Sequence, residues 1–453
     1  MAKAKARAAK LQDEYLQILG EMSGDAAGRE AGDAHLGESY GKYDNLKWAT
    51  NPLIFDAKQY EMLDNAARTF SSIMEKVMAR YQRDPFFRKL FGLPTKVEHL
   101  TRVPSGCHAA VPLARLDVFY DPVSGNFHIA GVATGGVDGM ATSLAATRAV
   151  KSTGAYRAFA AKHSGIEDFD PLTACLKAVL NTYASWANAE EGRNHPTNPS
   201  FAIVDVAGSP RADETATAVS RLTEMGHYAH ATDLAELRIQ TVGGLPQLVD
   251  NQGPVTCVWL RAKAEEALKV EKGLDALVEA TRRGLVCTVG GYRSWPCCVR
   301  SFFSVLRNKQ CRAFLTDEEN AFVDAHVPDT YVLETSLDLS EFYDQENWVL
   351  RETDGRDVSG SHVGKEMRKA DWRKALVKGI KHHYVVQEYI AQQGMKVAMA
   401  DDEGMPIVSE QNTMLSLYVF GGELSGIGAA CGASDADAVL GSAREMACMV
   451  VRD

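Results

Sequence analysis

The residues best suited to chemistry lie in one strand–turn–strand segment that ends in a glycine-rich loop. Residues 116–140 read LDVFYDPVSGNFHIAGVATGGVDGM and follow Arg115. Apolar residues on both sides of a turn at residues 121–125 predict two short strands, with Asp117 inside the first. The loop carries Asp138, and backbone N–H groups of such loops can approach a phosphate. This is the outline of a metal–nucleotide site, yet the positions in between are small and uncharged: Gly131, Ala133 and Gly135.

Two further segments have a composition that suits a ligand cleft. The loop at residues 355–364 is rich in glycine and serine and could cover a nucleotide, although most loops of this kind are plain connections. Gln387 and Glu388 interrupt an apolar strand predicted at residues 384–390, so they face either water at a sheet edge or a ligand cavity. Neither GxxxxGK[ST] nor GxGxxG occurs in the sequence, which excludes P-loop and dinucleotide-binding motifs.

The overall composition is that of a globular protein and limits the expected partners. A net charge of −10 argues against nucleic acid as a primary partner. There is no run of 18 apolar residues to span a membrane and no apolar leader of the secretory type, so no membrane partner is expected. Nine scattered cysteines without framework spacing fit a reducing environment, and we expect a cytoplasmic location.

The elements that would position these residues change character along the chain. Helical periodicity is present at residues 2–22 and 58–83, and the glycine-rich stretch at 23–45 predicts a loose connection between them. From residue 201 onward, short buried strands alternate with helices, which predicts a small parallel sheet. The last third contains strands that are typical of an antiparallel sheet with one covered face.

Taken in order, six segments resemble the circularly permuted ATP-grasp proteins, the group that includes glutathionylspermidine-synthase-like carboxylate–amine ligases. They are residues 114–121, 202–234, 255–262, 327–333, 346–372 and 385–390. The resemblance extends from about residue 40 to the C-terminus. It implies an α/β ATP-grasp fold in circularly permuted order. Four parts are expected: an N-terminal helical region (1–100), a core part with the former metal-binding strands (101–199), a Rossmann-like α/β subdomain (200–290), and the lid and nucleotide-binding part (291–453).

The resemblance also implies roles for individual residues. In such enzymes ATP phosphorylates a substrate carboxylate, an amine attacks the acyl phosphate, and two Mg²⁺ ions bridge the phosphates. Asp117 matches a metal-binding aspartate of this family. Three arginines are expected at the catalytic site: Arg115, which is retained, and Arg300 and Arg351, which stand at two lysine positions. The residues expected to bind ATP are Gln387, Glu388, Tyr389, Ile390, Ser359 and Gly360.

The sequence departs from the family pattern mainly at the metal ligands. The family has glutamate, asparagine and aspartate where this chain has Gly131, Ala133 and Gly135, and its final arginine falls near Ala430. Mg²⁺ prefers hard oxygen ligands. We therefore expect the Mg²⁺ site on Asp117 to be weakened or absent.

Three functions follow as hypotheses. The first is an ATP-dependent ligase that joins a carboxylate to an amine, with a peptide-like or polyamine-like substrate. The second is a degenerate relative that binds a nucleotide or a partner protein, for example an active paralogue, without ligating. The third is a scaffold with an empty cleft. In each, the strands around Gln387 and Tyr418 should pack beside the strand of Asp117, under a lid formed by residues 348–364.

Overall fold

The computed structural model describes residues 2–40, 46–104, 109–122, 124–189, 195–353, 361–392, 394–400, 406–432 and 443–452. Ser359 and Gly360, two of the expected nucleotide-binding residues, lie outside these ranges, as does most of the loop at residues 355–364. No helix of the described part is long and apolar enough to cross a membrane.

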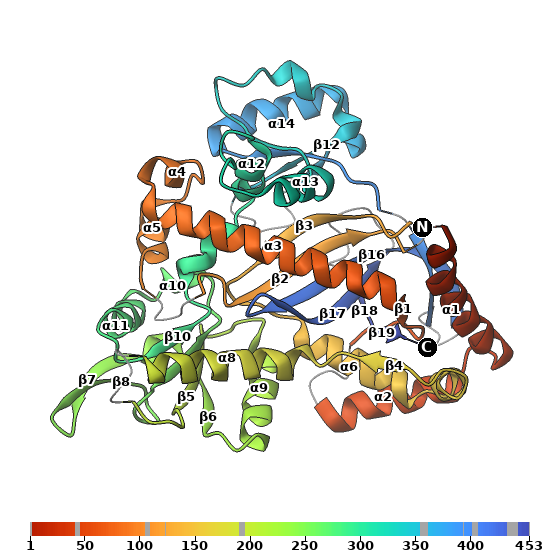
Figure 1. Ribbon diagram of the computed structural model, residues 1–453, viewed down its shortest axis with the longest axis horizontal. Coiled ribbons are helices and arrows are strands. Elements are labelled where there is room, and N and C mark those ends of the chain that lie inside the picture. The colour runs from red at the N-terminus through yellow and green to blue at the C-terminus, as the bar shows by residue number, and fades with distance from the viewer. Residues whose placement is uncertain are drawn as a thin grey trace.

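Within the described residues, a six-stranded antiparallel sheet occupies the centre of the molecule (Figure 1). The early hairpin is paired with strands from the end of the chain, because Ser416 lies opposite Asp117 in the ladder. This confirms that the Tyr418 strand packs beside the strand of Asp117. The order is β18 (Arg444–Met446), β17 (Glu423–Gly432), β16 (Pro406–Phe420), β2 (Leu113–Tyr120) and β3 (Phe127–Ala133), with β15 (Gly394–Ala400) pairing β16.

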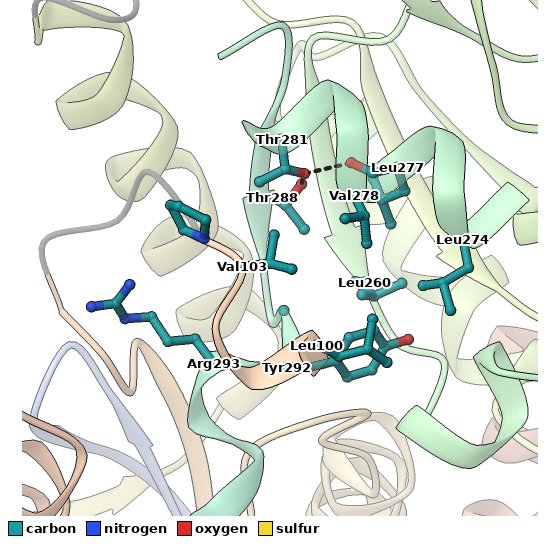
Figure 2. A pocket seen from close by; sticks show the side chains of 12 residues that line it. Leu100, Val103, Leu260, Leu274, Leu277, Val278, Thr281, Thr288, Tyr292 and Arg293 are labelled. Carbon is teal, nitrogen blue, oxygen red and sulfur yellow. Dashed lines mark hydrogen bonds between the residues drawn. The ribbon is translucent and has the colours of Figure 1, made fainter. Parts of the chain in front are cut away.

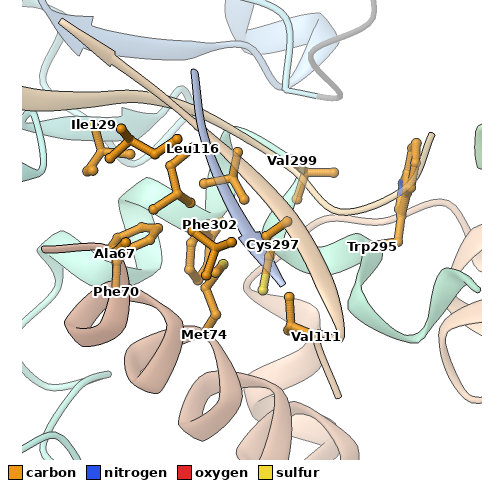
Figure 3. Packing of buried hydrophobic residues seen from close by; sticks show 14 of the residues in the cluster. Ala67, Phe70, Met74, Val111, Leu116, Ile129, Trp295, Cys297, Val299 and Phe302 are labelled. Atoms are coloured by element: carbon orange, nitrogen blue, oxygen red, sulfur yellow. The ribbon is translucent and has the colours of Figure 1, made fainter. Parts of the chain in front are cut away.

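Helix α3 (Ala57–Arg83) covers one face of this sheet (Figure 1). Its start is set by Asp56, which accepts the N–H of Gln59 at 2.9 Å in a capping box. Figure 3 shows Phe70 and Met74 of α3 gathered with Leu116 of β2, all fully buried. Because side chains alternate along a strand, this packing turns Leu116 toward α3 and leaves its neighbours on the opposite face of the sheet.

A parallel sheet lies beside the central sheet, as the sequence predicts for residues 201–289 (Figure 1). The strand order across this sheet is β10, β9, β5 and β6, so β5 and β9 are the inner strands. Helices α8, α9 and α11 pack around it, and a two-stranded hairpin projects from it. The elements are α8 (Pro171–Asn188), β5 (Phe201–Asp205), α9 (Ala212–Glu224), β6 (Ala229–Asp233), β7 (Arg238–Val242), β8 (Leu245–Val249), β9 (Cys257–Leu260), α10 (Ala264–Ala267), α11 (Glu271–Arg282) and β10 (Cys287–Val289).

A third sheet forms what we call the lid unit, residues 328–353 and 361–390, at the top of Figure 1. One face of this sheet packs on helix α14 through a small apolar core that includes Leu350, Val386 and Trp372. Helices α12 and α13 lie between the lid unit and α3 in the view of Figure 1. The elements are β11 (Thr330–Val332), β12 (Trp348–Arg351), β13 (His362–Val363), α14 (Lys369–His382), β14 (Val385–Glu388), α12 (Ser301–Arg307) and α13 (Asp317–His326).

Strands from the N-terminal and C-terminal parts of the chain pair in a small sheet. In it β1 runs parallel to β19, and β4 pairs antiparallel with the other edge of β19. Helices α1, α2, α6 and α7 surround it. The remaining helices α4 and α5 connect α3 to the central sheet. The bounds are α1 (Ala2–Glu21), α2 (Ala26–Tyr40), β1 (Leu53–Asp56), α4 (Pro85–Lys89), α5 (Thr95–Thr101), α6 (Met140–Ser152), α7 (Gly154–Ala160), β4 (Ile166–Asp168) and β19 (Cys448–Val451).

Two expectations about the fold are wrong. Residues 23–45 are not a loose connection, because helix α2 runs from Ala26 to Tyr40. Gly32 allows α2 to approach Trp48 and the backbone of Ala149 so closely that a Cβ would clash, and this packing overrides weak helix propensity. The strand of Gln387 does not join the sheet of Asp117, because β14 pairs with β11 and β12 in the lid unit.

Candidate functional site

The face of the central sheet opposite α3 carries the polar residues of β2. We call it the open face because α3 does not cover it; helices α6 and α8 pack over its strands β16 to β18. Arg115 and Asp117 are two residues apart on β2, so both side chains point to this face. Ser416 and Tyr418 of β16 stand beside them in the ladder. Gly131 of β3 lies directly opposite Asp117 in the hairpin.

Arg115 is enclosed by carboxylates. Its Nε donates to Asp117 Oδ1 at 2.8 Å and its Nη2 to Asp117 Oδ2 at 3.1 Å, a two-bond fork. Its Nη1 donates to Asp138 Oδ1 at 2.5 Å and to the Asp138 carbonyl at 3.1 Å. Ser416 donates a further bond to Asp117 at 3.3 Å. Both oxygens of Asp117 are therefore already occupied by a cation that belongs to the protein.

This arrangement does not fit Mg²⁺ on Asp117. Arg115 already bonds to both oxygens of Asp117, and its positive charge opposes a second cation at the same carboxylate. Burial opposes the charged forms of Arg115 and Asp138. The facing opposite charges nevertheless hold the pKa of Arg115 well above its ordinary value and the pKa of Asp138 below its ordinary value. In the described part of the chain, no group of three or more His, Cys, Asp or Glu residues could hold a metal ion.

The glycines around the open face differ in what they allow. A Cβ on Gly131 would stand 3.6 Å from Asp117 Oδ2, so a side chain fits there. A Cβ on Gly135 would lie 2.9 Å from the ring of Trp295. The indole therefore fills the space that a metal-binding side chain at position 135 would need. Gly136 has φ +64° and approaches the Arg261 carbonyl closely, which restricts this position to glycine.

Sequence reasoning missed a buried ion pair beneath the glycine-rich loop. Arg261, which follows β9 and is fully buried, donates to Glu214 at 2.5 Å and to the Val137 carbonyl at 3.0 Å. Glu214 in turn accepts the N–H of Ala141 at 2.8 Å, at the start of α6. The pair therefore connects the parallel sheet to the loop that carries Asp138. A signal was available, because a charged residue directly after an apolar strand often lies at the carboxyl edge of a parallel sheet, where sites form.

A second missed residue, Glu445, lies at the rim of the open face. It stands on β18 opposite Ala430, the position where the family's arginine was expected. Burial raises its pKa to about 7, with Glu214 and Asp138 adding to the rise and Thr142 and Arg115 opposing it. The sequence offered no signal for Glu445, because its place depends on the pairing of β17 with β18.

The raised pKa of Glu445 predicts a pH-dependent penalty on folding. Between pH 4.5 and 7 the unfolded chain loses this proton while the folded chain keeps it, so stability falls as pH rises through this window and is level above it. The shift corresponds to about 3 kcal/mol. Solvent contact of the half-buried side chain reduces this to about 1–2 kcal/mol.

Glu445→Gln should remove the penalty. Thermal melts of both proteins should coincide near pH 5 and diverge toward pH 8, with the variant the more stable. As a control, Glu423→Gln, at the exposed start of β17, should show no such divergence. A constant difference between Glu445→Gln and the wild type across pH would contradict the assignment.

The two other expected catalytic arginines do not join Arg115. Arg300 begins α12; its backbone N–H donates to the Thr353 carbonyl at 2.7 Å, and its side chain donates to the Ala130 carbonyl of β3 at 3.4 Å. Arg300 thus connects the lid unit to the edge of the central sheet. Arg351 is buried on β12, and because its neighbour Leu350 packs toward α14, Arg351 points to the opposite face of the lid sheet.

The expected nucleotide residues of β14 are divided between two faces. Gln387 is buried on the same lid face as Arg351 and donates to the Thr330 hydroxyl at 3.0 Å. Glu388 is exposed and accepts the N–H of Asp329. Tyr389 accepts a hydrogen bond from Lys365, whose ammonium also lies 4.4 Å from its ring centre.

Ile390 connects the lid unit to the open face. It lines a cavity of about 200 Å³ together with Phe119 of β2 and His128 of β3. Phe119 is two residues beyond Asp117 and shares its face, so the cavity begins about 7 Å along the strand from Asp117. Of the expected nucleotide-binding residues that the structure describes, Ile390 is the one that lies toward the Asp117 strand.

Another cavity is too small to be a ligand site. It holds about 30 Å³ between α5, α11 and β9, and is lined mainly by apolar side chains such as Leu260 and Leu277. Figure 2 shows Thr281, with its hydroxyl bonded to the Leu277 carbonyl and to Thr288, at its rim. This is room for about one water molecule.

The comparisons with known proteins support the fold. No protein-family model and no curated protein matches the sequence. A glutathione synthetase-like effector from Globodera pallida matches with a TM-score of 0.57 at 13% identity, over 98% of each chain. D-alanyl-alanine synthetase A from Vibrio cholerae covers 48% of this chain and 67% of its own, at 10% identity; its TM-score of 0.26 is too low to carry an argument. The chain therefore shares the mixed α/β, ATP-grasp-like fold of this effector.

Proposed function

We propose that this protein is a non-ligating member of the ATP-grasp-like proteins that binds a nucleotide between its lid unit and the open face. The observation that carries the proposal is the double fork of Arg115 to Asp117 and Asp138. A guanidinium in that place satisfies the carboxylates without a metal ion. The electrostatic stabilisation that phosphoryl transfer requires from Mg²⁺ is then missing, while the cleft itself is retained.

The position of the cavity at Ile390 supports an orientation in which the base of the nucleotide lies in this cavity. Its walls combine aromatic and apolar side chains such as Phe119 and Ile390, which suit a base, with polar ones such as Asn126, and Phe119 places the cavity next to the sheet face of Arg115 and Asp117. Arg115 is four residues from Phe119, about 13 Å along β2.

Calorimetric titration with ATP, with and without Mg²⁺, tests the proposal. We expect binding that does not depend on Mg²⁺ and no release of ADP when mixtures of peptide acids and amines are added. His128→Ala should weaken binding, whereas His227→Ala, a half-buried histidine just before β6 at the edge of the parallel sheet, should not. Absence of binding under both conditions would refute the nucleotide proposal.

The second candidate is an active carboxylate–amine ligase in permuted ATP-grasp order. The full-length likeness to a glutathione synthetase-like fold favours it. It predicts Mg²⁺-dependent turnover of ATP to ADP with a carboxylate and an amine substrate, and loss of turnover in Asp117→Asn. Turnover in the wild type that Asp117→Asn abolishes would replace the first proposal with this one.

Restoring the missing ligands is a further prediction. Gly131 and Ala133 face Asp117 and Arg115 across the hairpin, and the space at Gly131 is open. Gly131→Glu with Ala133→Asn adds two oxygen ligands, so Mg²⁺ should then strengthen ATP binding by about tenfold. The same calorimetry on Gln240→Glu, on exposed strand β7 of the projecting hairpin, is the control for added charge. An unchanged Mg²⁺ response in the double variant would exclude a metal role for this face.

A further inference from the structure

Helix α14 of the lid unit turns one face to the lid sheet and the opposite face to solvent (Figure 1). Trp372, Leu376 and Gly379 are buried and recur at helical spacing, so they form the packed face. The packing is close, because a Cβ on Gly379 would lie 2.6 Å from a leucine methyl group. Arg351 and Gln387 point to the other face of the lid sheet. The solvent face of α14 is therefore separate from the proposed nucleotide site.

The solvent face of α14 carries a concentration of positive charge. Residues 365–383 contain seven lysines and arginines but only two acidic residues, in a chain whose net charge is −10. The charge of this segment is therefore opposite in sign to that of the whole chain. Five basic residues of the helix are exposed: Lys369, Arg373, Lys374, Lys378 and Lys381.

Three of these lysines form a line along the helix. Lys374, Lys378 and Lys381 are four and three residues apart, so they share the side that lies opposite the packed face, over about 10 Å of the axis. Val377, which is 54% exposed, lies beside them. We call these four residues the basic stripe. Among the described residues, its one ion pair joins Lys374 to Asp371 at 3.9 Å.

The acidic residues of the lid unit do not neutralise the basic stripe. Residues 338–346 contain four acidic residues, and the ring of Tyr343 in this segment lies 4.3 Å from the guanidinium of Arg373. Arg373 is about 100° around the helix from Lys374, so the acidic segment borders one flank of α14. Charges elsewhere on the molecule are screened beyond about 8 Å at physiological ionic strength. The stripe therefore presents positive charge to a partner that approaches it from solvent.

We propose that the basic stripe docks the protein on a membrane surface that contains anionic lipids. Lysines on one face of a helix attract acidic headgroups, and an apolar side chain among them, here Val377, can enter the boundary between headgroups and acyl chains. Surface docking needs no spanning segment, so the expectation of no membrane partner, which rested on the lack of one, does not bear on it.

Two features favour a lipid surface over a single acidic molecule. The charged members of the stripe are all lysines, whose compact and strongly hydrated charge suits diffuse attraction, whereas paired hydrogen bonds to one carboxylate or phosphate are characteristic of arginine. The exposed side of a helix is also convex. It offers a flat partner a line of contacts but gives a small molecule no pocket.

Flotation of the full chain with lipid vesicles tests the proposal. One set of vesicles contains phosphatidylcholine alone, and the other adds about 30 mol% phosphatidylserine. We expect the protein to float with the phosphatidylserine vesicles and to stay behind with the phosphatidylcholine vesicles. About 1 M NaCl should release it, because the Debye length is then about 3 Å. Equal flotation with both sets, or flotation with neither, would overturn the proposal.

Paired substitutions show whether binding belongs to the basic stripe. Lys374→Gln with Lys381→Gln should weaken partitioning into phosphatidylserine vesicles about 25-fold, because each lysine near an anionic surface contributes a factor of about five. The matched control is Lys269→Gln with Lys272→Gln, which removes two exposed lysines at the start of α11 and should leave partitioning unchanged. Thermal melts of both variants should match the wild type. An equal loss in the control would contradict the assignment to α14.

Competition distinguishes a lipid surface from an acidic protein partner. A glutamate-rich peptide, added at the same concentration of negative charge as the phosphatidylserine, should leave the protein on the vesicles. Displacement by the peptide, together with peptide binding that Lys374→Gln with Lys381→Gln weakens, would assign the stripe to an acidic protein segment and overturn the membrane proposal.

Discussion

Removal of the Arg115 guanidinium is expected to lower the free energy of unfolding by about 2–4 kcal/mol at pH 7, because it leaves Asp117 and Asp138 facing each other without a cation. The side chains of Arg115 and Asp117 are each only 17% exposed, so water cannot replace the lost bonds fully. Arg115→Met keeps most of the aliphatic volume of the side chain, so its effect on stability reports the loss of the guanidinium and not a loss of packing. Urea unfolding of Arg115→Met against wild type measures the loss.

The same variant should gain a property that the wild type lacks. With the guanidinium gone, two carboxylates are available on the open face, and Mg²⁺ or Mn²⁺ should raise the melting temperature of Arg115→Met in proportion to occupancy. The wild type should not respond. Arg115→Met with Asp117→Asn should recover part of the stability and lose the metal response. If millimolar Mn²⁺ stabilises wild type and variant equally, Arg115 does not substitute for a metal ion.

The second large effect is expected at Arg261. Arg261→Met should cost about 3–5 kcal/mol, because Glu214 is then left buried without its partner. Arg261 also donates to Thr215 at 3.2 Å and lies over the Trp259 ring at 4.8 Å. Because Arg261 donates a hydrogen bond to the Val137 carbonyl, Arg261→Met should also loosen the loop that carries Asp138. Binding of any ligand to the open face should then weaken.

A double-mutant cycle isolates the charge pair. Glu214→Gln keeps an oxygen for the N–H of Ala141, so Arg261→Met with Glu214→Gln removes both charges while retaining that bond. We expect the double variant to be more stable than Arg261→Met alone, by about 1–3 kcal/mol in denaturant melts. A double variant that is the less stable of the two would show that Glu214 is held by groups other than Arg261.

The elements of the fold were predictable where local pattern and tertiary packing agree. The strands at residues 201–205 and 257–260 are short apolar runs between helices, and they form the parallel sheet as expected. Helix α2 was not predictable in this way, because its glycines favour a loop when taken alone. In the folded protein, Gly32 instead allows the helix to pack closely against Trp48. That contact joins segments whose proximity the sequence does not reveal.

The candidate site was predictable only in part for a related reason. An arginine and an aspartate two residues apart on one strand must share a face, so the Arg115–Asp117 pair was implicit in the sequence. The third member, Asp138, lies across the hairpin and could be named only as a neighbouring carboxylate. Glu445 could not be named at all, because it reaches this face through the pairing of two C-terminal strands.

The pairing of β2 with β16 has a consequence for synthesis on the ribosome. Asp117 and its partner Ser416 are 299 residues apart, so at ordinary translation rates about 15–60 s separate their appearance. Strand β19, which pairs with β1, is completed only at Val451. The nascent hairpin β2–β3 must therefore wait with an uncovered edge, while residues 201–289 contain the four strands of a complete sheet and can fold first. Ligand-binding competence should accordingly arise only once residues 444–451 have left the ribosome, in one late step, and deletion of these residues should abolish it.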